Sequence, residues 1–370
     1  MKHWITNQLE IAHGKHNPLK AMEGLRGVAV FLVFLVHYSS LIEPWLTDTA
    51  ISISSFIHSF GHLGVDLFFI LSGYLIYGTI ISKKTFEVMN YAKSRVMRIY
   101  PTFLFVFVVY LFLSIIFPKE SKLPSETLPL ITYLIQNILL LPGLFDIKPI
   151  ITVAWSLSYE VFYYFLIPIL ICILSLKKWS SKRRVMVWVL ITILGFILVY
   201  LYGGPVRLLM FVSGIILFEF HKIQSVQLKS WGTISFILAL LLFGTRSIID
   251  INYHLSLMIV YLLFFVFCLS AFSPKSFSSK WLVFSPLRWL GNMSYSYYLV
   301  HGLTLKFLFL LLSILIPATQ SSLSIYFWLL IPFFMTTLIV SFCLFVGIER
   351  PLSIAGKKHS EPLTSKLTRT

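Results

Sequence analysis

Arg26 and His37 are eleven residues apart, at the start of the first long apolar stretch of the sequence. At about 100° per residue, eleven helical positions come within roughly 20° of three whole turns, so the two side chains share one face of a helix. The rise of about 1.5 Å per residue places His37 about 16 Å beyond Arg26 along that helix. A neutral imidazole near physiological pH can act as a general base. The spacing predicts a proton-accepting His37 with Arg26 at the mouth of the helix, although an anchoring arginine and a structurally satisfied histidine would give the same pattern.

Two carboxylates also lie inside apolar stretches, where an ionised group is costly and usually faces a partner or a cavity. Asp66 lies in GHLGVDLFFILSGYLI, which covers residues 61–76, and Glu160 lies in WSLSYEVFYYF, which covers residues 155–165. A carboxylate can orient a catalytic imidazole, as it does in hydrolase triads. We expect Glu160 or Asp66 to hold the His37 ring or balance its charge, with Glu160 closest to it in expected depth. Asp66 can equally be a structural partner between helices.

Arg95 and Arg98 are three residues apart in YAKSRVMRIYP, just before the third apolar run. That spacing puts both guanidinium groups on one face of a helix. Arginine suits phosphate because its planar fork can donate two parallel hydrogen bonds. Together with Arg26, the pair predicts a site for a phosphorylated metabolite such as coenzyme A, and a role in orienting the chain in the membrane is the alternative.

Four further side chains, Trp155, Ser156, Tyr297 and His301, have the chemistry to bind a sugar. The first two precede Glu160, and the other two fall in the segment SYSYYLVH, which ends at His301. Aromatic rings pack against sugar faces, and hydroxyl and imidazole groups hydrogen-bond sugar hydroxyls. We expect these four residues to line a binding site for a sugar-containing substrate, which is the acceptor of the transfer reaction described below. Trp155 by itself is also typical of the aromatic belt at a membrane interface.

Composition indicates which elements hold these residues. Of 370 residues, 58% are hydrophobic and 12% are charged, with a mean hydropathy of +0.86, far outside the range of soluble proteins. Long unbroken apolar runs exclude the alternating strands of an outer-membrane barrel and predict about ten transmembrane helices in an all-α integral membrane protein. The runs are 27–46, 62–81, 99–117, 151–175, 185–202, 205–220, 231–249, 252–272, 293–316 and 325–347.

The distribution of basic residues predicts the topology. Twenty-four of the 30 Lys and Arg residues fall on one side when the loops are alternated, and the opposite loops hold only Lys119, Lys122, Lys148, Arg207 and Arg246. The positive-inside rule then places both termini in the cytoplasm. We expect a cytoplasmic N-terminal segment at 1–26, a transmembrane domain at 27–348, a cytoplasmic tail at 349–370, and a short interfacial or re-entrant helix within 124–142.

Several functional classes lose support from the sequence. The net charge of +16 is explained by orientation and contact with anionic lipids, so we expect no nucleic-acid partner. The motifs G-x-S-x-G, H-E-x-x-H and the Walker loop are absent. The three cysteines, Cys172, Cys268 and Cys343, lie inside apolar runs, and no metal site is expected.

Taken together, these segments resemble the acyltransferase-3 family of membrane O-acyltransferases, which O-acetylate bacterial surface polysaccharides. The resemblance runs from about residue 20 to residue 351. Its elements, in order, are KAMEGLRGVAVFLVFLVH, GVDLFFILSGYLI, RVMRIYP, WSLSYEVFYY, SYSYYLVH and ERP.

The resemblance implies a multi-pass protein of the bacterial inner (plasma) membrane that transfers an acyl group, usually acetyl, from cytoplasmic acyl-CoA to a hydroxyl of a cell-surface or lipid-linked glycan. His37 matches the family's catalytic histidine, Arg26 its paired arginine, and Arg95 with Arg98 its cytoplasmic arginine pair. Glu23 stands where the family often has Asp. Some members carry a C-terminal esterase-like domain, which is not seen here, so we expect the chain to act alone or with a separate partner.

Two other classes remain open. A transporter or flippase for a glycan or lipid precursor could use His37, Glu160 and Asp66 as a proton relay. A non-catalytic membrane scaffold is the other alternative, but it leaves the buried ionisable groups without a purpose. Acetyl-CoA binding that depends on Arg95 and Arg98 would separate the enzyme from both.

Overall fold

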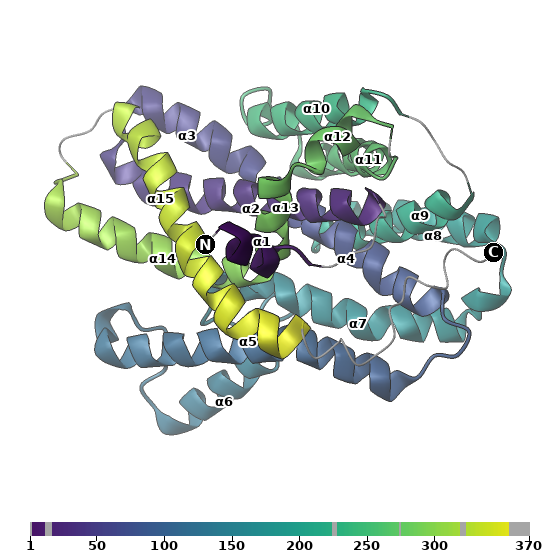
Figure 1. Ribbon diagram of the computed structural model, residues 1–370, viewed down its shortest axis with the longest axis horizontal. Coiled ribbons are helices and arrows are strands. Elements are labelled where there is room, and N and C mark those ends of the chain that lie inside the picture. Colours follow the sequence, from purple (N-terminus) through teal and green to yellow (C-terminus); the bar gives the residue numbers. More distant parts are fainter. Residues whose placement is uncertain (1, 12–16, 224–227, 274, 319–322, 355–370) are drawn as a thin grey trace.

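The computed structural model describes residues 2–11, 17–223, 228–273, 275–318 and 323–354, which form fifteen α-helices and no β-strand (Figure 1). The predicted all-α fold is confirmed. The helices are α1 (Lys2–Leu9), α2 (Asn17–Ile42), α3 (Asp48–Gly61), α4 (Leu63–Ile81), α5 (Val88–Ile116), α6 (Thr127–Ile138), α7 (Trp155–Ile173), α8 (Ser181–Tyr202), α9 (Leu209–Ile223), α10 (Trp231–Thr245), α11 (Tyr253–Ala271), α12 (Phe277–Leu282), α13 (Ser285–Asn292), α14 (Ser294–Leu315) and α15 (Leu323–Leu344).

Each of the ten predicted apolar runs forms a helix, but only eight helical stretches of the described chain are long and apolar enough to cross a membrane. Helices α9 and α10 have 15 residues each, so they are about 22 Å long, against a hydrocarbon core of about 30 Å. Helix α3 was not predicted, and it continues into α4 with only a short break at His62. The segment expected at 124–142 forms the short helix α6.

Helix α2, which carries Arg26 and His37, lies in the middle of the bundle and is packed by α3, α4, α13 and α14 (Figure 1). Its approach to α13 is close enough that a Cβ added at Gly291 would lie 1.7 Å from the backbone oxygen of Glu23. Only glycine fits at such a contact, and small residues allow this kind of approach between membrane helices. The α2–α13 contact therefore fixes the inner end of α2, near Arg26.

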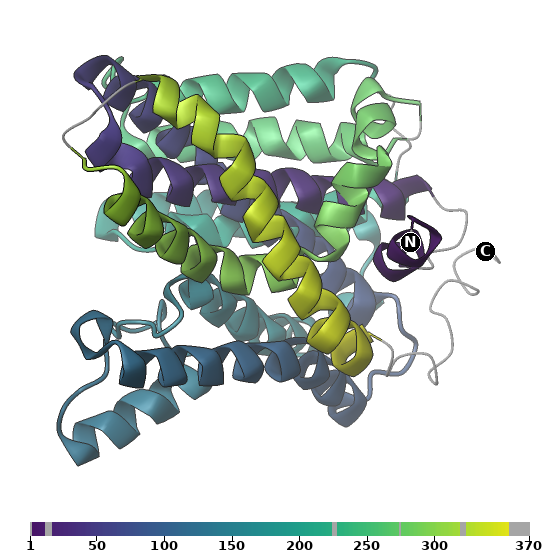
Figure 2. The same cartoon turned by 60° about the vertical axis from the view of Figure 1, so that its left-hand side comes forward.

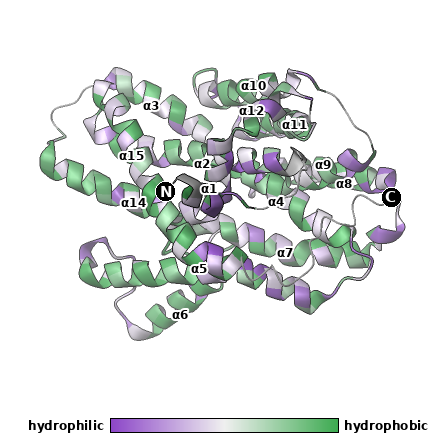
Figure 3. Ribbon diagram, in the orientation of Figure 1, coloured by the Kyte–Doolittle hydropathy of each residue, from purple (hydrophilic) through white to green (hydrophobic). Residues whose placement is uncertain are grey.

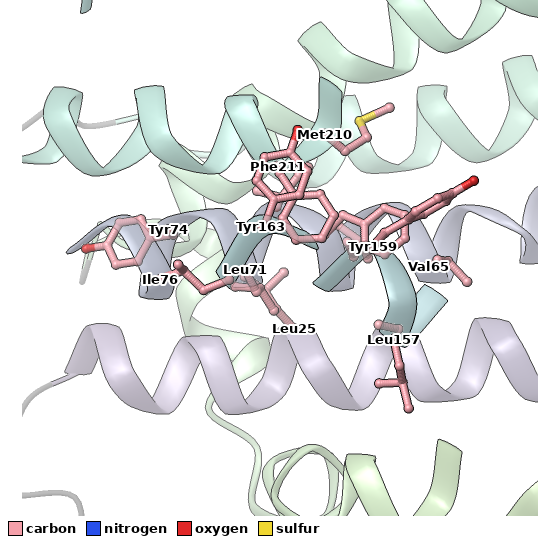
Figure 4. Packing of buried hydrophobic residues seen from close by; sticks show 14 of the residues in the cluster. Leu25, Val65, Leu71, Tyr74, Ile76, Leu157, Tyr159, Tyr163, Met210 and Phe211 are labelled. Atoms are coloured by element: carbon pink, nitrogen blue, oxygen red, sulfur yellow. The ribbon is translucent and has the colours of Figure 1, made fainter. Parts of the chain in front are cut away.

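The apolar core packs aromatic rings between α4, α7 and α9. Tyr163 and Phe211 stack with ring centres 4.0 Å apart and planes 11° apart, and Leu71 and Tyr159 lie close by (Figure 4). Van der Waals packing of this kind holds membrane helices together, because lipid removes most of the hydrophobic drive for association.

Other helices face outward. Beyond its first turn, α8 consists almost wholly of hydrophobic residues, and many of their side chains are exposed, as expected of a helix that faces lipid (Figure 3). Hydrophilic residues gather mainly at helix ends and in loops (Figure 3).

The last described helix changes geometry as it reaches the inner face. Helix α15 crosses the bundle obliquely, and its C-terminal continuation η6 (Phe345–Ile354), a π-helix, contacts α5 (Figure 2). A π-helical stretch widens the turn, and such stretches are frequent at functional sites. This one brings Glu349 against Arg98 of α5.

Candidate active site

His37 faces a second histidine in the interior of the bundle. Its side chain is partly exposed, although the neighbouring Val36 and Tyr38 are buried. The His301 ring, from α14, is fully buried, and the two ring centres are 5.0 Å apart with the planes tilted by 57°. The structure therefore brings together a predicted catalytic residue and a predicted acceptor-binding residue.

The backbone fixes the protonation pattern of His301. Its Nδ1 atom lies 2.9 Å from the carbonyl oxygen of Tyr297. A carbonyl oxygen only accepts hydrogen bonds, so Nδ1 carries the proton and Nε2 of the neutral ring has a free lone pair. That Nε2 atom is buried and has no hydrogen-bond partner among the described residues. A buried acceptor left open in this way is rare in folded proteins, which points to a ligand or a second proton donor.

The other predicted acceptor-binding residues lie on both sides of His301. Tyr297 stacks on the His301 ring at 5.3 Å, and its hydroxyl bonds Thr337 at 2.8 Å. The Ser156 hydroxyl lies 2.7 Å from the hydroxyl of Tyr298, whose ring centre is 6.0 Å from that of His301. Ser156 and Tyr297 are thus close to the histidine pair.

Trp155 points elsewhere. Its ring packs edge-on against Phe69 and Tyr159, and it does not touch the histidines in any contact that the described residues show.

A second group of charged residues lies toward the inner face, and we call Arg26, Arg95, Arg98, Glu160 and Glu349 the inner cluster. The Arg95 guanidinium lies over two tyrosine rings, at 4.9 Å from the centre of Tyr91 and 5.0 Å from that of Tyr164. Its Nε atom is buried without a hydrogen-bond partner, and none of the ion pairs in the described chain involves it. A guanidinium that is positioned by aromatic rings and has unpaired N–H donors is suited to bind an anion.

Arg98 and Arg26 have acidic neighbours. The Arg98 guanidinium lies 3.5 Å from the buried carboxylate of Glu349, which also accepts hydrogen bonds from the backbone and hydroxyl of Ser296 at 3.0 and 2.6 Å. The charges that act on Arg26 are those of Arg98, Glu160, Glu23 and Glu349. Arg26 and Arg98 therefore belong to one electrostatic cluster, and Arg95 joins it through Tyr164, which lies under Arg95 and bonds Glu160.

Glu160 lies in this cluster and not beside His37, which corrects the expected depth. Its carboxylate accepts a hydrogen bond from Tyr164, the tyrosine under Arg95. The reason is the start of α7: the chain folds back into the bundle after α6, so that Ser156 meets Tyr298 on the first turns of α14. Glu160, one turn further along α7, then lies level with the arginines.

Asp66 is also held away from His37. Its Oδ2 atom lies 3.1 Å from the guanidinium of Arg207, which also donates to the backbone oxygen of His62 at 2.9 Å. The described residues show no hydrogen bond or ion pair between His37 and either predicted carboxylate. The sequence could not reveal this, because Arg207 lies in a different loop and reaches Asp66 only after α4 and α9 pack together.

Two histidines near His37 were not predicted. His58 and His62 are four residues apart at the end of α3, and their rings meet edge-on with centres 4.7 Å apart. Both act electrostatically with His37. Their spacing of one helical turn is the signal that the sequence offers, but residues 47–61 fall between two of the predicted apolar runs.

No group of three or more His, Cys, Asp or Glu side chains in the described ranges is arranged to hold a metal ion.

Comparison with known proteins places these features in a family. A family description, "acyltransferase domain", matches residues 19–346. The chain is 27% identical to the O-acetyltransferase OatA of Staphylococcus aureus (strain NCTC 8325 / PS 47), over 76% of this chain and 50% of that protein. It is 25% identical to the peptidoglycan O-acetyltransferase OatA of Listeria monocytogenes, over 76% of this chain and 48% of the relative. The chain thus spans about half the length of the curated relatives it matches, and no solved structure matches it.

Proposed function

Because this chain belongs to the membrane acyltransferase family whose domain description covers residues 19–346, we propose that it is an O-acetyltransferase of the bacterial plasma membrane. It takes the acetyl group from cytoplasmic acetyl-CoA and transfers it to a hydroxyl of a cell-surface or lipid-linked glycan. The names of the relatives, O-acetyltransferase and peptidoglycan O-acetyltransferase, support both the acetyl group and the glycan acceptor.

The observation that carries the proposal is the histidine pair above the inner cluster. The rings of His37 and His301 lie 5.0 Å apart in the interior, His301 has an open Nε2, and Arg26 lies eleven residues before His37 on the same helix. That spacing corresponds to about 16 Å. A donor whose phosphates bind near Arg95 and Arg98 has a pantetheine arm long enough to reach the histidines.

His37 then acts as the general base. One of its ring nitrogens removes the proton from the acceptor hydroxyl while the oxygen attacks the thioester carbonyl. The tetrahedral intermediate collapses, the carbon–sulfur bond breaks, and the thiolate of coenzyme A receives the proton from His37. The products are an O-acetyl ester and free coenzyme A, and no further reactant is needed.

His301 takes the orienting role that the sequence assigned to Glu160 or Asp66. A ring separation of about 5 Å is the one expected when an imidazole N–H donates to the nitrogen of another imidazole at about 2.9 Å. After a small rotation of the His37 ring, its N–H donates to Nε2 of His301, and the second nitrogen of His37 presents its lone pair to the acceptor hydroxyl. Selecting one tautomer in this way is what the carboxylate does in a hydrolase triad.

The transporter alternative receives no support from the geometry. A proton relay needs His37, Glu160 and Asp66 to exchange protons, directly or through water. In the described part of the chain, Glu160 bonds Tyr164, Asp66 pairs with Arg207, and His37 faces His301.

The proposal is tested by His37→Ala in cells that otherwise lack this gene. Mass spectrometry of the surface glycans should show acetylation with the parental chain and a loss of at least about 100-fold with the variant, the lower end of what a general base contributes. His221→Gln is the matched control and should keep acetylation, because His221 lies on α9 and contacts Tyr74 of α4, away from the histidine pair. Parental acetylation by a correctly inserted His37→Ala protein would remove the proposed mechanism.

A further inference from the structure

A third polar group lies on the side of the bundle opposite the basic loops, and we call His58, His62, Asp66, Arg207 and Arg246 the outer cluster. It joins the end of α3, the start of α4, the segment before α9 and the end of α10. Both arginines meet Tyr253: the Arg207 Nε donates to its hydroxyl at 3.2 Å, and the Arg246 guanidinium lies over its ring at 5.2 Å.

The two arginines differ in their partners. Arg207 is neutralised by Asp66 at 3.1 Å and also donates to the backbone of His62. Arg246 has only the rings of Phe243 and Tyr253 beneath it, at 5.1 and 5.2 Å, and its buried Nε has no hydrogen-bond partner in the described chain. No ion pair involving Arg246 is present among these residues. The outer cluster therefore keeps one uncompensated positive charge with open donors.

An uncompensated arginine such as Arg246 is unexpected in an outer loop. Lys and Arg in outer loops oppose the orientation that the positive-inside rule favours, and the outer loops hold only five of them. Two of the five converge here, although a guanidinium with a buried, unpaired N–H carries a desolvation cost. A purely structural arginine would be expected to pair all its donors, as Arg184 does with Glu219, Leu176 and Trp179.

The outer cluster is also next to the catalytic histidine. Gly61, the residue before His62, packs against Val36, the residue before His37: a Cβ added at Gly61 would lie 2.8 Å from the Val36 side chain. His62 also lies within electrostatic range of Arg246, Arg207, His58 and His37. All of these side chains are partly exposed, in contrast to the buried residues around them on α2 and α4. A ligand held by Arg246 would therefore lie in the electrostatic neighbourhood of His62, on the side of α4 that packs against α2 beside His37.

We propose that the outer cluster binds an oxyanion of the acceptor, with Arg246 as its main ligand and His58 and His62 as additional hydrogen-bond donors. The acceptor class is then an anionic glycan, whose charge is a sugar carboxylate or a phosphate, and its hydroxyl is presented to His37 from the side opposite the acetyl-CoA site. This inference rests on the proposed function and specifies its acceptor.

The test uses the full-length protein in lipid nanodiscs and three sugars that share one ring. Methyl α-glucoside is neutral, methyl α-glucuronide carries a carboxylate, and glucose 1-phosphate carries a phosphate. Isothermal titration should show at least one anionic sugar binding roughly tenfold more tightly than the neutral one, the gain expected from one charge-assisted hydrogen bond. Whichever anionic sugar binds more tightly identifies the source of the charge.

Substitutions test whether the preference for anionic sugars depends on the outer cluster. Arg246→Gln should reduce the preference to roughly equal binding of all three sugars, and Arg246→Lys should retain part of it because the charge remains. Lys148→Gln removes another outer cation that lies outside the outer cluster, and it should leave the preference unchanged. An equal affinity for neutral and anionic sugars, no binding of any of the three, or a preference that survives Arg246→Gln would each overturn the inference.

Failure of this inference can be told apart from failure of the proposed function. Acetyl-CoA binding is titrated separately on the same preparations and depends on the inner cluster. If acetyl-CoA binds and cells acetylate their glycans while anionic sugars show no preference, only the inference on the acceptor fails. If anionic sugars bind through Arg246 but no acetyl transfer depends on His37, the proposed function fails.

Discussion

The imidazole of His301 lies 5.0 Å from that of His37, with its Nδ1 bonded to the carbonyl of Tyr297 and its Nε2 left open. This relationship gives His37 a neutral, uncharged partner in a position where hydrolases use a carboxylate. In a low-dielectric interior such a pair avoids the desolvation cost of an ionised acid.

The partnership predicts a graded response at His301. His301→Ala removes the acceptor for His37 and should lower kcat by roughly 10- to 100-fold, the equivalent of about 1.5–3 kcal/mol for one oriented hydrogen bond. His301→Gln keeps an oxygen near the place of Nε2 and should recover part of the rate. The KM for acetyl-CoA should change little in both variants, because the proposed donor site is the inner cluster and not the histidine pair. Equal rates in the Ala and Gln variants would contradict an orienting role.

The inner cluster predicts a separate effect on donor binding. Arg95→Gln removes a cation that makes no ion pair among the described residues, so the Kd for acetyl-CoA should rise by roughly 10- to 100-fold. Lys93→Gln is the matched control, because Lys93 lies two residues away on α5, is exposed and should not contact the donor. Both affinities can be measured by titration calorimetry in detergent. An Arg95→Gln protein that binds acetyl-CoA as tightly as the parental chain would exclude Arg95 from the donor site.

The contact between α2 and α13 predicts a stability effect. Gly291→Ala would place a methyl group 1.7 Å from the Glu23 oxygen, so one helix must move, and the expected loss is about 1–3 kcal/mol with a lower Tm. Gly302→Ala on α14 is the control, since no atom lies within 4 Å of its Cβ position. Thermal unfolding of the two purified variants compares them directly, and equal Tm values would mean that α13 can shift without cost.

The N-terminal helix predicts a dependence on pH. Glu10 accepts hydrogen bonds from Arg288 at 2.6 Å and from Trp289 at 3.0 Å. Burial acts to raise the pKa of Glu10, but these bonds and the charge of Arg288 outweigh it and hold the pKa below its usual value of 4.5. A carboxyl group with a lowered folded-state pKa contributes stability that is present above pH 4.5 and is lost as the pH falls through the lowered value.

Limited proteolysis at several pH values would detect this change. Cleavage within residues 2–11 should increase at acidic pH in the parental chain. The Glu10→Gln variant should show this increased cleavage already at neutral pH. If cleavage of the parental chain does not change below pH 4.5, the bonds of Glu10 do not hold α1 in place.

The helical membrane fold could be predicted from the sequence, as could the helical spacing of Arg26 with His37 and of Arg95 with Arg98. These are local properties, since hydrophobic runs of sufficient length must form helices in lipid and residues at helical spacing must share a face. The short helix α6 followed from the same reasoning. The break between α3 and α4 and the reduced length of α9 and α10 did not, because apolar composition says little about where a buried helix ends.

Which polar groups meet could not be predicted, because it depends on how the helices pack against one another. Glu160 joined the arginines because α7 begins deep in the bundle, and Asp66 met Arg207 across α4 and α9. His301 reached His37, and Arg246 reached Tyr253, from segments far apart in the chain. The depth at which each helix starts and the direction each face takes depend on packing between helices, and that packing depends on contacts such as Gly291 against Glu23, which no local pattern encodes.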